Sequence, residues 1–165
     1  MSPEQLRERA WAAASGVADP ELPVLTIAEL GILRDVRVDE GGTVEVAITP
    51  TYTGCPATAV IALDVVTAME RAGITGCRVR TVLSPPWTSD WLTPEGRRKL
   101  VEAGIAPPAC GVGTARAALF AADPVACPRC GGSATERLAE FGATACKALY
   151  RCRSCGEPFE HFKCL

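Results

Sequence analysis

Four cysteines in the last third of the chain have the spacing of a metal site. Two Cys-x-x-Cys pairs, Cys127/Cys130 and Cys152/Cys155, are separated by a spacer of 21 residues. Each pair can hold one edge of a tetrahedral ion, and two pairs complete the four-thiolate shell typical of structural zinc. A redox dithiol and disulfides are the alternatives, and the duplicated pair favours zinc over both. The sequence therefore predicts a zinc ribbon of short β-strands over residues 125–165.

Three further side chains near the second pair are also metal-ligating types, namely Cys146, His161 and Cys164. If residues 146–164 fold as a hairpin about the second pair, Cys146 lies opposite His161, and Cys164 lies nearby. One interpretation is a second metal site or an alternative ligand set for the first. The other is that the cysteines pack as small hydrophobic residues while His161 lies at the surface. An iron–sulfur centre is compatible with the same residues.

Cys55 stands apart from the others, between Gly54 and Pro56, where a strand gives way to a helix. Proline is favoured in the first helical position, so we expect Cys55 at the N-cap, where the helix dipole lowers the pKa of its thiol. Gly54 permits a close approach by a ligand, and Thr53 adds a hydroxyl group. A nucleophile needs a neighbouring base, and the single histidine, His161, belongs to the other module.

Two interpretations of Cys55 remain open from the residues alone. It can be a thiolate that handles a soft metal, in which case a second copy of the chain or a partner must supply further ligands for any iron–sulfur cluster. It can equally be a small buried residue at a tight turn. A homodimer is thus one of the expected assemblies.

The elements that must position these side chains follow from the hydrophobic pattern, the caps and the turn residues. We expect a helix at 3–15, a helical turn at 27–31, strands at 32–39 and 43–49, a helix at 56–72, a strand at 77–83 and a helix at 93–104. This order predicts an α+β fold in which a three-stranded sheet carries helices on one face. The expected organisation is one domain over 1–109, a linker over 110–124 and the ribbon over 125–165.

The bulk properties limit the classes of protein. The chain has 165 residues, 48% of them hydrophobic, and a formal net charge of −2, which gives no reason to expect nucleic acid. The N-terminal stretch lacks the apolar core of a secretory signal, and no segment is long and apolar enough to span a membrane. We therefore expect a cytoplasmic protein. With nine cysteines, an odd number, metal binding is favoured over disulfides. Cys77 and Cys110 are interpreted as a strand core residue and a linker residue.

Two groups of motifs resemble known families. The segments "ADPELPVLTIAELGILRDV" and "TPTYTGCPAT" resemble the SufT-like cytosolic iron–sulfur assembly factors. The segments "SPPWTSDWLTPEGRRKL", "CPRCGG" and "FGATACKALYRCRSCGEPFEHFKC" resemble the PaaD family of phenylacetate-degradation proteins, also described as D or J subunits of ring 1,2-phenylacetyl-CoA epoxidase. The resemblance covers nearly the whole chain in order, and the combination of both modules is specific.

This resemblance implies a function in aerobic phenylacetate catabolism. It implies a non-catalytic accessory protein that assists maturation of the metal centres of the epoxidase system, whose di-iron oxygenase and flavin/iron–sulfur reductase subunits are the implied partners. Cys55 corresponds to the cysteine proposed in the family to handle the cluster, and Asp19 and Glu21 to the acidic loop near it. The implied cofactors are zinc in the ribbon and iron or an iron–sulfur cluster held transiently.

Two other functions are weighed against this one. The chain can be a stoichiometric structural subunit of the epoxidase complex. It can also be a nucleic-acid-binding ribbon protein, although the net charge and the interspersed Glu157 and Glu160 argue against that function. Direct catalysis is disfavoured because a di-iron carboxylate site requires Glu-x-x-His patterns, and the chain has none.

Overall fold

The computed structural model describes residues 1–109 and 125–164, and these residues divide into two compact units. The first unit is Met1–Trp87 and the second is Thr88–Leu165. The predicted linker at 110–124 lies outside the described residues. None of the helices in the described part is long and apolar enough to cross a membrane.

The first unit contains two helices whose ends follow from local chemistry. Helix α1 (Pro3–Ser15) begins with a capping box, in which the Ser2 hydroxyl accepts from the amide of Gln5 and the Gln5 side chain accepts from the amide of Ser2. Helix α2 (Ala57–Arg71) buries the side chains that recur along one of its faces, namely Ala57, Ile61, Val65 and Met69. Both helices agree with the sequence prediction.

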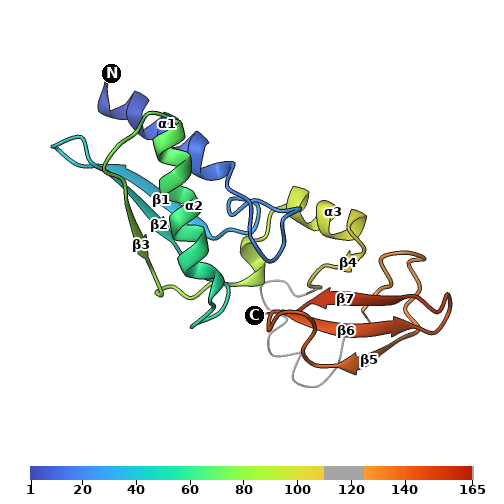
Figure 1. Ribbon diagram of the computed structural model, residues 1–165. Helices are drawn as coiled ribbons and strands as arrows, with labels where there is room; N and C mark the ends of the chain where they lie inside the picture. Colours follow the sequence, from blue (N-terminus) through green and yellow to red (C-terminus); the bar gives the residue numbers. More distant parts are fainter. Residues whose placement is uncertain (110–124, 165) are drawn as a thin grey trace. The chain divides into compact units, whose positions relative to one another are not determined.

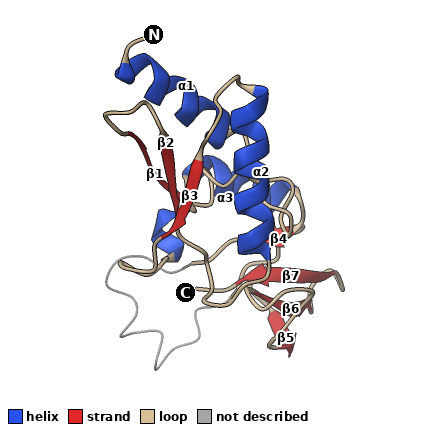
Figure 2. Cartoon of the chain, turned by 60° about the vertical axis from the view of Figure 1, so that its left-hand side comes forward, coloured by secondary structure: helices blue, strands red, loops and turns tan. Residues whose placement is uncertain are grey.

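The sheet of the first unit has the strand order β1-β2-β3 (Figure 1). Strands β1 (Leu33–Val38) and β2 (Val44–Ile48) form an antiparallel hairpin, and β3 (Arg78–Thr81) pairs parallel to β2. One face carries the aligned valines Val36, Val46 and Val79, whereas the other carries mainly charged side chains. Helices α1 and α2 contact each other and the sheet, and Figure 2 shows α2 alongside the strands. The predicted α+β layer is confirmed.

The segment between α1 and β1 contains the predicted helical turn at 27–31, in which the amide of Leu30 donates to the carbonyl oxygen of Thr26 at 3.0 Å. Thr26 and Glu29 form a reciprocal capping pair, and Gly31 then adopts a φ of 72°. The indole nitrogen of Trp87, which is buried, donates to the carbonyl oxygen of Leu30 at 2.8 Å. Trp87 therefore anchors the end of this unit to the turn before β1.

The second unit starts with a 3-10 turn (η1, Ser89–Trp91) and helix α3 (Pro94–Glu102), capped by the Thr93 hydroxyl. Its four-stranded sheet has the order β4-β7-β6-β5. These strands are β4 (Ile105–Ala106), β5 (Thr135–Ala139), β6 (Lys147–Cys152) and β7 (Pro158–Phe162).

The unit boundary differs from the one expected near residue 109. Strand β4 pairs in parallel with β7 at Ile105↔Glu160 and Ala106↔His161, so the segment after α3 is part of the ribbon sheet. Ala106 also packs into the small ribbon core with Cys127, Cys152 and Phe159. A two-residue strand has no periodicity of its own, so only the long-range pairing shows where this segment belongs.

Candidate functional site

The two cysteine pairs form matching knuckles in the second unit. In the first, the carbonyl oxygen of Cys127 accepts from the amide of Gly131 at 2.9 Å, and in the second the carbonyl oxygen of Cys152 accepts from Gly156 at 2.9 Å. Both glycines have positive φ values, 73° and 79°, which other residues rarely adopt. Both knuckles share this pattern of turn and glycine, which follows from the repeated local sequence Cys-x-x-Cys-Gly.

The four sulfur atoms have the spacing of a tetrahedral thiolate site. All four lie within 4.8 Å of one another, and no other group of three or more such ligands was found in the described residues. The Sγ–Sγ distances are 3.8 Å for Cys127–Cys155 and 3.6 Å for Cys130–Cys152. A tetrahedron with Zn–S bonds of about 2.3 Å has edges of about 3.8 Å. The residues therefore fit zinc, which would hold the two knuckles together.

The protonation of these thiols also favours a bound cation. Amides of Cys155 and Ser154 donate toward the Cys152 sulfur and lower its pKa to about 6. For Cys155 the amide of Glu157 lowers the pKa, but burial and the sulfurs around it prevail and raise the pKa to about 12. Four sulfurs this close cannot all ionise unless a positive charge lies between them. A divalent ion supplies that charge, and zinc binding would release protons.

The residues of the predicted second metal site, Cys146, His161 and Cys164, have a different strand register from the one expected. His161 lies opposite Ala148, and Cys146 lies opposite Lys163, a shift of two residues. The Nδ1 atom of His161 lies 3.2 Å from the carbonyl oxygen of Ala106, and burial lowers the pKa of the imidazole. Cys164 is disulfide-bonded. The second metal site stays a prediction that this geometry does not favour.

Cys55 lies one residue further from the helix than expected. Pro56 occupies the N-cap of α2, and Cys55 precedes it, with its amide donating to the carbonyl oxygen of Tyr52 at 3.2 Å. Gly54 has a φ of 81°, and a Cβ there would meet no atom within 4 Å. Glycine is therefore required by the backbone conformation of this turn, and the turn leaves Cys55 half-buried.

The predicted low pKa of Cys55 is wrong in sign. Burial is the largest cause of its raised pKa, and the carboxylates of Glu21 and Asp19 raise it further. The amides of Ala57 and Thr58, at the start of α2, lower the pKa but do not outweigh these effects. The thiol is therefore protonated at neutral pH, within a site that is already negatively charged.

Asp19 folds the acidic loop whose carboxylates act on the Cys55 thiol. The Oδ1 atom of Asp19 accepts from the amides of Glu21 and Leu22, each at 2.8 Å, and the Asp19 side chain is buried. This Asx-type turn closes with the amide of Asp19 donating to the carbonyl oxygen of Leu25 at 2.9 Å. Asp19 thus shapes the loop, whereas Glu21 is the more exposed of its two carboxylates.

The remaining predicted positions are placed as follows. Thr53 is exposed in the turn before Cys55. Cys77 is half-buried just before β3, with its pKa raised by burial, and is not a core residue. Cys110 lies outside the described residues. The sequence reasoning missed Glu136 on β5, whose alignment with Arg151 was not visible because a bulge interrupts the β5–β6 pairing.

Comparison with known proteins matches both units. Residues 7–84 match the iron–sulfur cluster assembly protein family, and residues 113–163 match the PaaD zinc beta ribbon domain. A protein of Escherichia coli (strain K12), named as the putative D subunit of 1,2-phenylacetyl-CoA epoxidase, is 47% identical over 166 residues. The match covers 100% of this chain and 96% of that protein.

Shorter relatives and solved structures match the first unit. The "Fe-S protein maturation auxiliary factor YitW" of Bacillus subtilis (strain 168) is 38% identical, covering 53% of this chain and 85% of that protein. The crystal structure of a domain of unknown function, DUF59, from Bacillus anthracis superposes with a TM-score of 0.56 at 29% identity. The superposition covers 61% of this chain and 95% of the Bacillus anthracis chain.

Proposed function

The chain belongs to the PaaD family, and we propose that it is a non-catalytic accessory factor of aerobic phenylacetate catabolism. It assists maturation of iron or iron–sulfur centres in the phenylacetyl-CoA epoxidase system, with the oxygenase and reductase subunits as its clients. The protein acts in the cytoplasm. The observation that carries this proposal is the half-buried Cys55 thiol beside the carboxylates of Glu21 and Asp19.

The electrostatics of Cys55 suit a site that receives a cation. Burial and two carboxylates disfavour a bare thiolate, so its negative charge is tolerated best when an iron ion is bound. The same carboxylates favour a cation near the sulfur, and the α2 amides stabilise the ionised sulfur. Iron binding would then release the thiol proton, which couples loading of the site to pH.

Cys55 has few of the features of a catalytic nucleophile. The only histidine of the chain is His161, in the second unit, so the first unit supplies no imidazole base. A single thiol also cannot complete the ligand set of an iron–sulfur cluster. The remaining ligands would come from the client or from a second copy of the chain, so that the cluster or ion is a cargo in transit.

The zinc ribbon serves as the stable module of the factor. Its described core is small, so a metal held by Cys127, Cys130, Cys152 and Cys155 would supply much of its folding free energy. This function for the metal is structural, which leaves Cys55 to handle iron.

The proposal is tested by the iron content of the clients. Epoxidase oxygenase and reductase subunits are purified from cells that express wild-type protein, Cys55→Ser or the matched control Cys77→Ser. We expect Cys55→Ser to lower the iron bound per client subunit severalfold, while Cys77→Ser leaves it unchanged. Full iron loading with Cys55→Ser contradicts the proposal.

A second candidate rests on the name of the Escherichia coli relative, which describes a subunit. In that case the chain is a stoichiometric structural component of the epoxidase. The two functions differ in one measurement, because a structural component must remain bound for activity. Mature complex stripped of the protein would lose activity if it is structural and keep it if it only assists maturation.

A further inference from the structure

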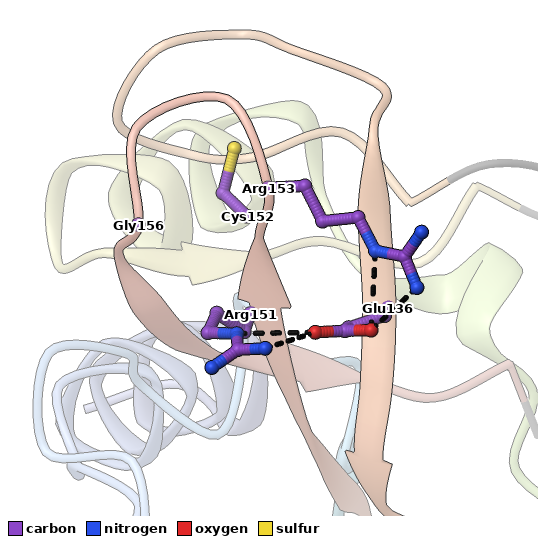
Figure 3. Close-up of a pocket in the computed structure, with 5 residues that line it drawn as sticks. All are labelled: Glu136, Arg151, Cys152, Arg153 and Gly156. Atoms are coloured by element: carbon purple, nitrogen blue, oxygen red, sulfur yellow. Dashed lines mark hydrogen bonds and ion pairs between the residues drawn. The ribbon is translucent and has the colours of Figure 1, made fainter.

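Two arginines beside the second knuckle share a single carboxylate. On Glu136, Oε1 accepts from the Nε and Nη2 atoms of Arg151, at 3.1 and 2.5 Å. Its other oxygen, Oε2, accepts from the Nε and Nη2 atoms of Arg153, at 3.1 and 2.6 Å. Figure 3 shows this arrangement, with the carboxylate of β5 between the two guanidinium groups. Glu136 therefore holds two arginine side chains in defined orientations.

One negative charge thus faces two positive charges, and the surplus is exposed. The side chains of Arg151 and Arg153 are 54% and 67% exposed, whereas Glu136 is 25% exposed. In Figure 3 the third nitrogen of each guanidinium, which Glu136 does not bind, points away from the carboxylate. These nitrogens keep donors for an external acceptor. Because both side chains are already held in place, binding there loses less conformational entropy.

Two other basic side chains of the ribbon are each paired with one carboxylate. Arg129 pairs with Glu157 at 2.8 Å, and the buried Lys147 pairs with Glu160 at 3.0 Å. The two arginines, by contrast, line an open hollow of about 560 Å³ together with Glu136, Cys152 and Gly156. The hollow is therefore a place on this unit where fixed, uncompensated donors meet accessible space.

We propose that this hollow binds an acidic segment of a partner protein, with one carboxylate on Arg151 and another on Arg153. The unbound nitrogens point to different sides of Glu136 in Figure 3, so one small anion cannot engage both, whereas neighbouring acidic side chains of an extended segment can. A continuous phosphate backbone fits less well, because its evenly spaced charges would also pass close to the carboxylates of Glu136 and Glu157. This inference does not depend on Cys55.

The test uses zinc-loaded full-length protein and a fluorescein-labelled peptide of four glutamates alternating with alanines, followed by fluorescence anisotropy. We expect Arg151→Gln and Arg153→Gln to weaken binding about fivefold each, as for an exposed charge pair. The matched control is Arg129→Gln, which removes the same charge from the same unit but leaves the hollow unchanged. The corresponding glutamine peptide should not bind.

The readouts separate binding from folding. Zinc content and circular dichroism should match wild type in each variant. A variant that loses zinc is replaced by Arg151→Lys or Arg153→Lys. Lysine keeps the positive charge but lacks the planar fork of the guanidinium group. Equal binding by wild type and a variant that combines Arg151→Gln with Arg153→Gln overturns the inference, as does an equal loss in Arg129→Gln. Tighter binding of single-stranded DNA, or complete competition by inorganic phosphate at equal charge concentration, also overturns it.

Discussion

Cys55 and Glu21 are electrostatically coupled, because burial and then the carboxylate of Glu21 raise the pKa of the Cys55 thiol above its usual 9.0. Glu21 lies in the loop that the Asx-type turn of Asp19 shapes, far from α2 in the sequence. A thiol under this influence is protonated at neutral pH and reacts slowly with electrophiles, because the thiolate is the reactive form.

Glu21→Gln should therefore make Cys55 more reactive. Removing a negative charge lowers the pKa, so more thiolate is present at any pH below it. We expect alkylation of Cys55 by iodoacetamide at pH 8 to be severalfold faster, because the rate follows the fraction of thiolate. The rate is followed by mass spectrometry of the Cys55 peptide across pH 7 to 10. Glu40→Gln, in the β1–β2 turn, is the control, and superimposable pH profiles for Glu21→Gln and wild type would refute this electrostatic coupling.

Asp19→Ala should destabilise the first unit. The substitution leaves two amides of the loop, those of Glu21 and Leu22, without their acceptor, at a cost of about 1–3 kcal/mol in the free energy of unfolding. Urea unfolding monitored by tryptophan fluorescence measures this loss. Asp19→Asn keeps an oxygen acceptor and should recover most of the stability. If Asn is as damaging as Ala, the negative charge and not the turn is what the fold requires.

Cys152→Ser should abolish stoichiometric zinc and unfold the second unit. Zinc binding to such modules contributes on the order of 10 kcal/mol, which a small core cannot replace. Elemental analysis should give one zinc per wild-type chain and well below one for the variant, with loss of the β6–β7 amide protection in hydrogen exchange. Cys77→Ser should keep its zinc. A folded ribbon without metal would show that the core suffices.

The local elements could be predicted because their signals are local. Ser2 and Pro3 mark the start of α1, and the alternation of valines marks the β1–β2 hairpin. The two Cys-x-x-Cys pairs predicted the thiolate cluster, since the knuckle shape depends on a few consecutive residues.

The features that could not be predicted depend on contacts between distant segments. The pairing of Ala106 with His161 places the segment after α3 in the ribbon sheet. The register of β6 with β7 places Ala148, and not Cys146, opposite His161. The pKa of Cys55 is raised and not lowered, because burial and the carboxylate of Glu21 outweigh the amides of α2. Neither effect is visible in the local sequence.

We propose that Cys55 takes part in passing iron to the epoxidase, and reconstitution in vitro tests this function most directly. Metal-free oxygenase and reductase subunits are incubated anaerobically with ferrous iron, sulfide and either wild-type protein or Cys55→Ser, and client iron is measured over time. We predict that wild type accelerates loading severalfold over the subunits alone, that Cys77→Ser does the same, and that Cys55→Ser gives no acceleration. Equal acceleration by Cys55→Ser would contradict the account.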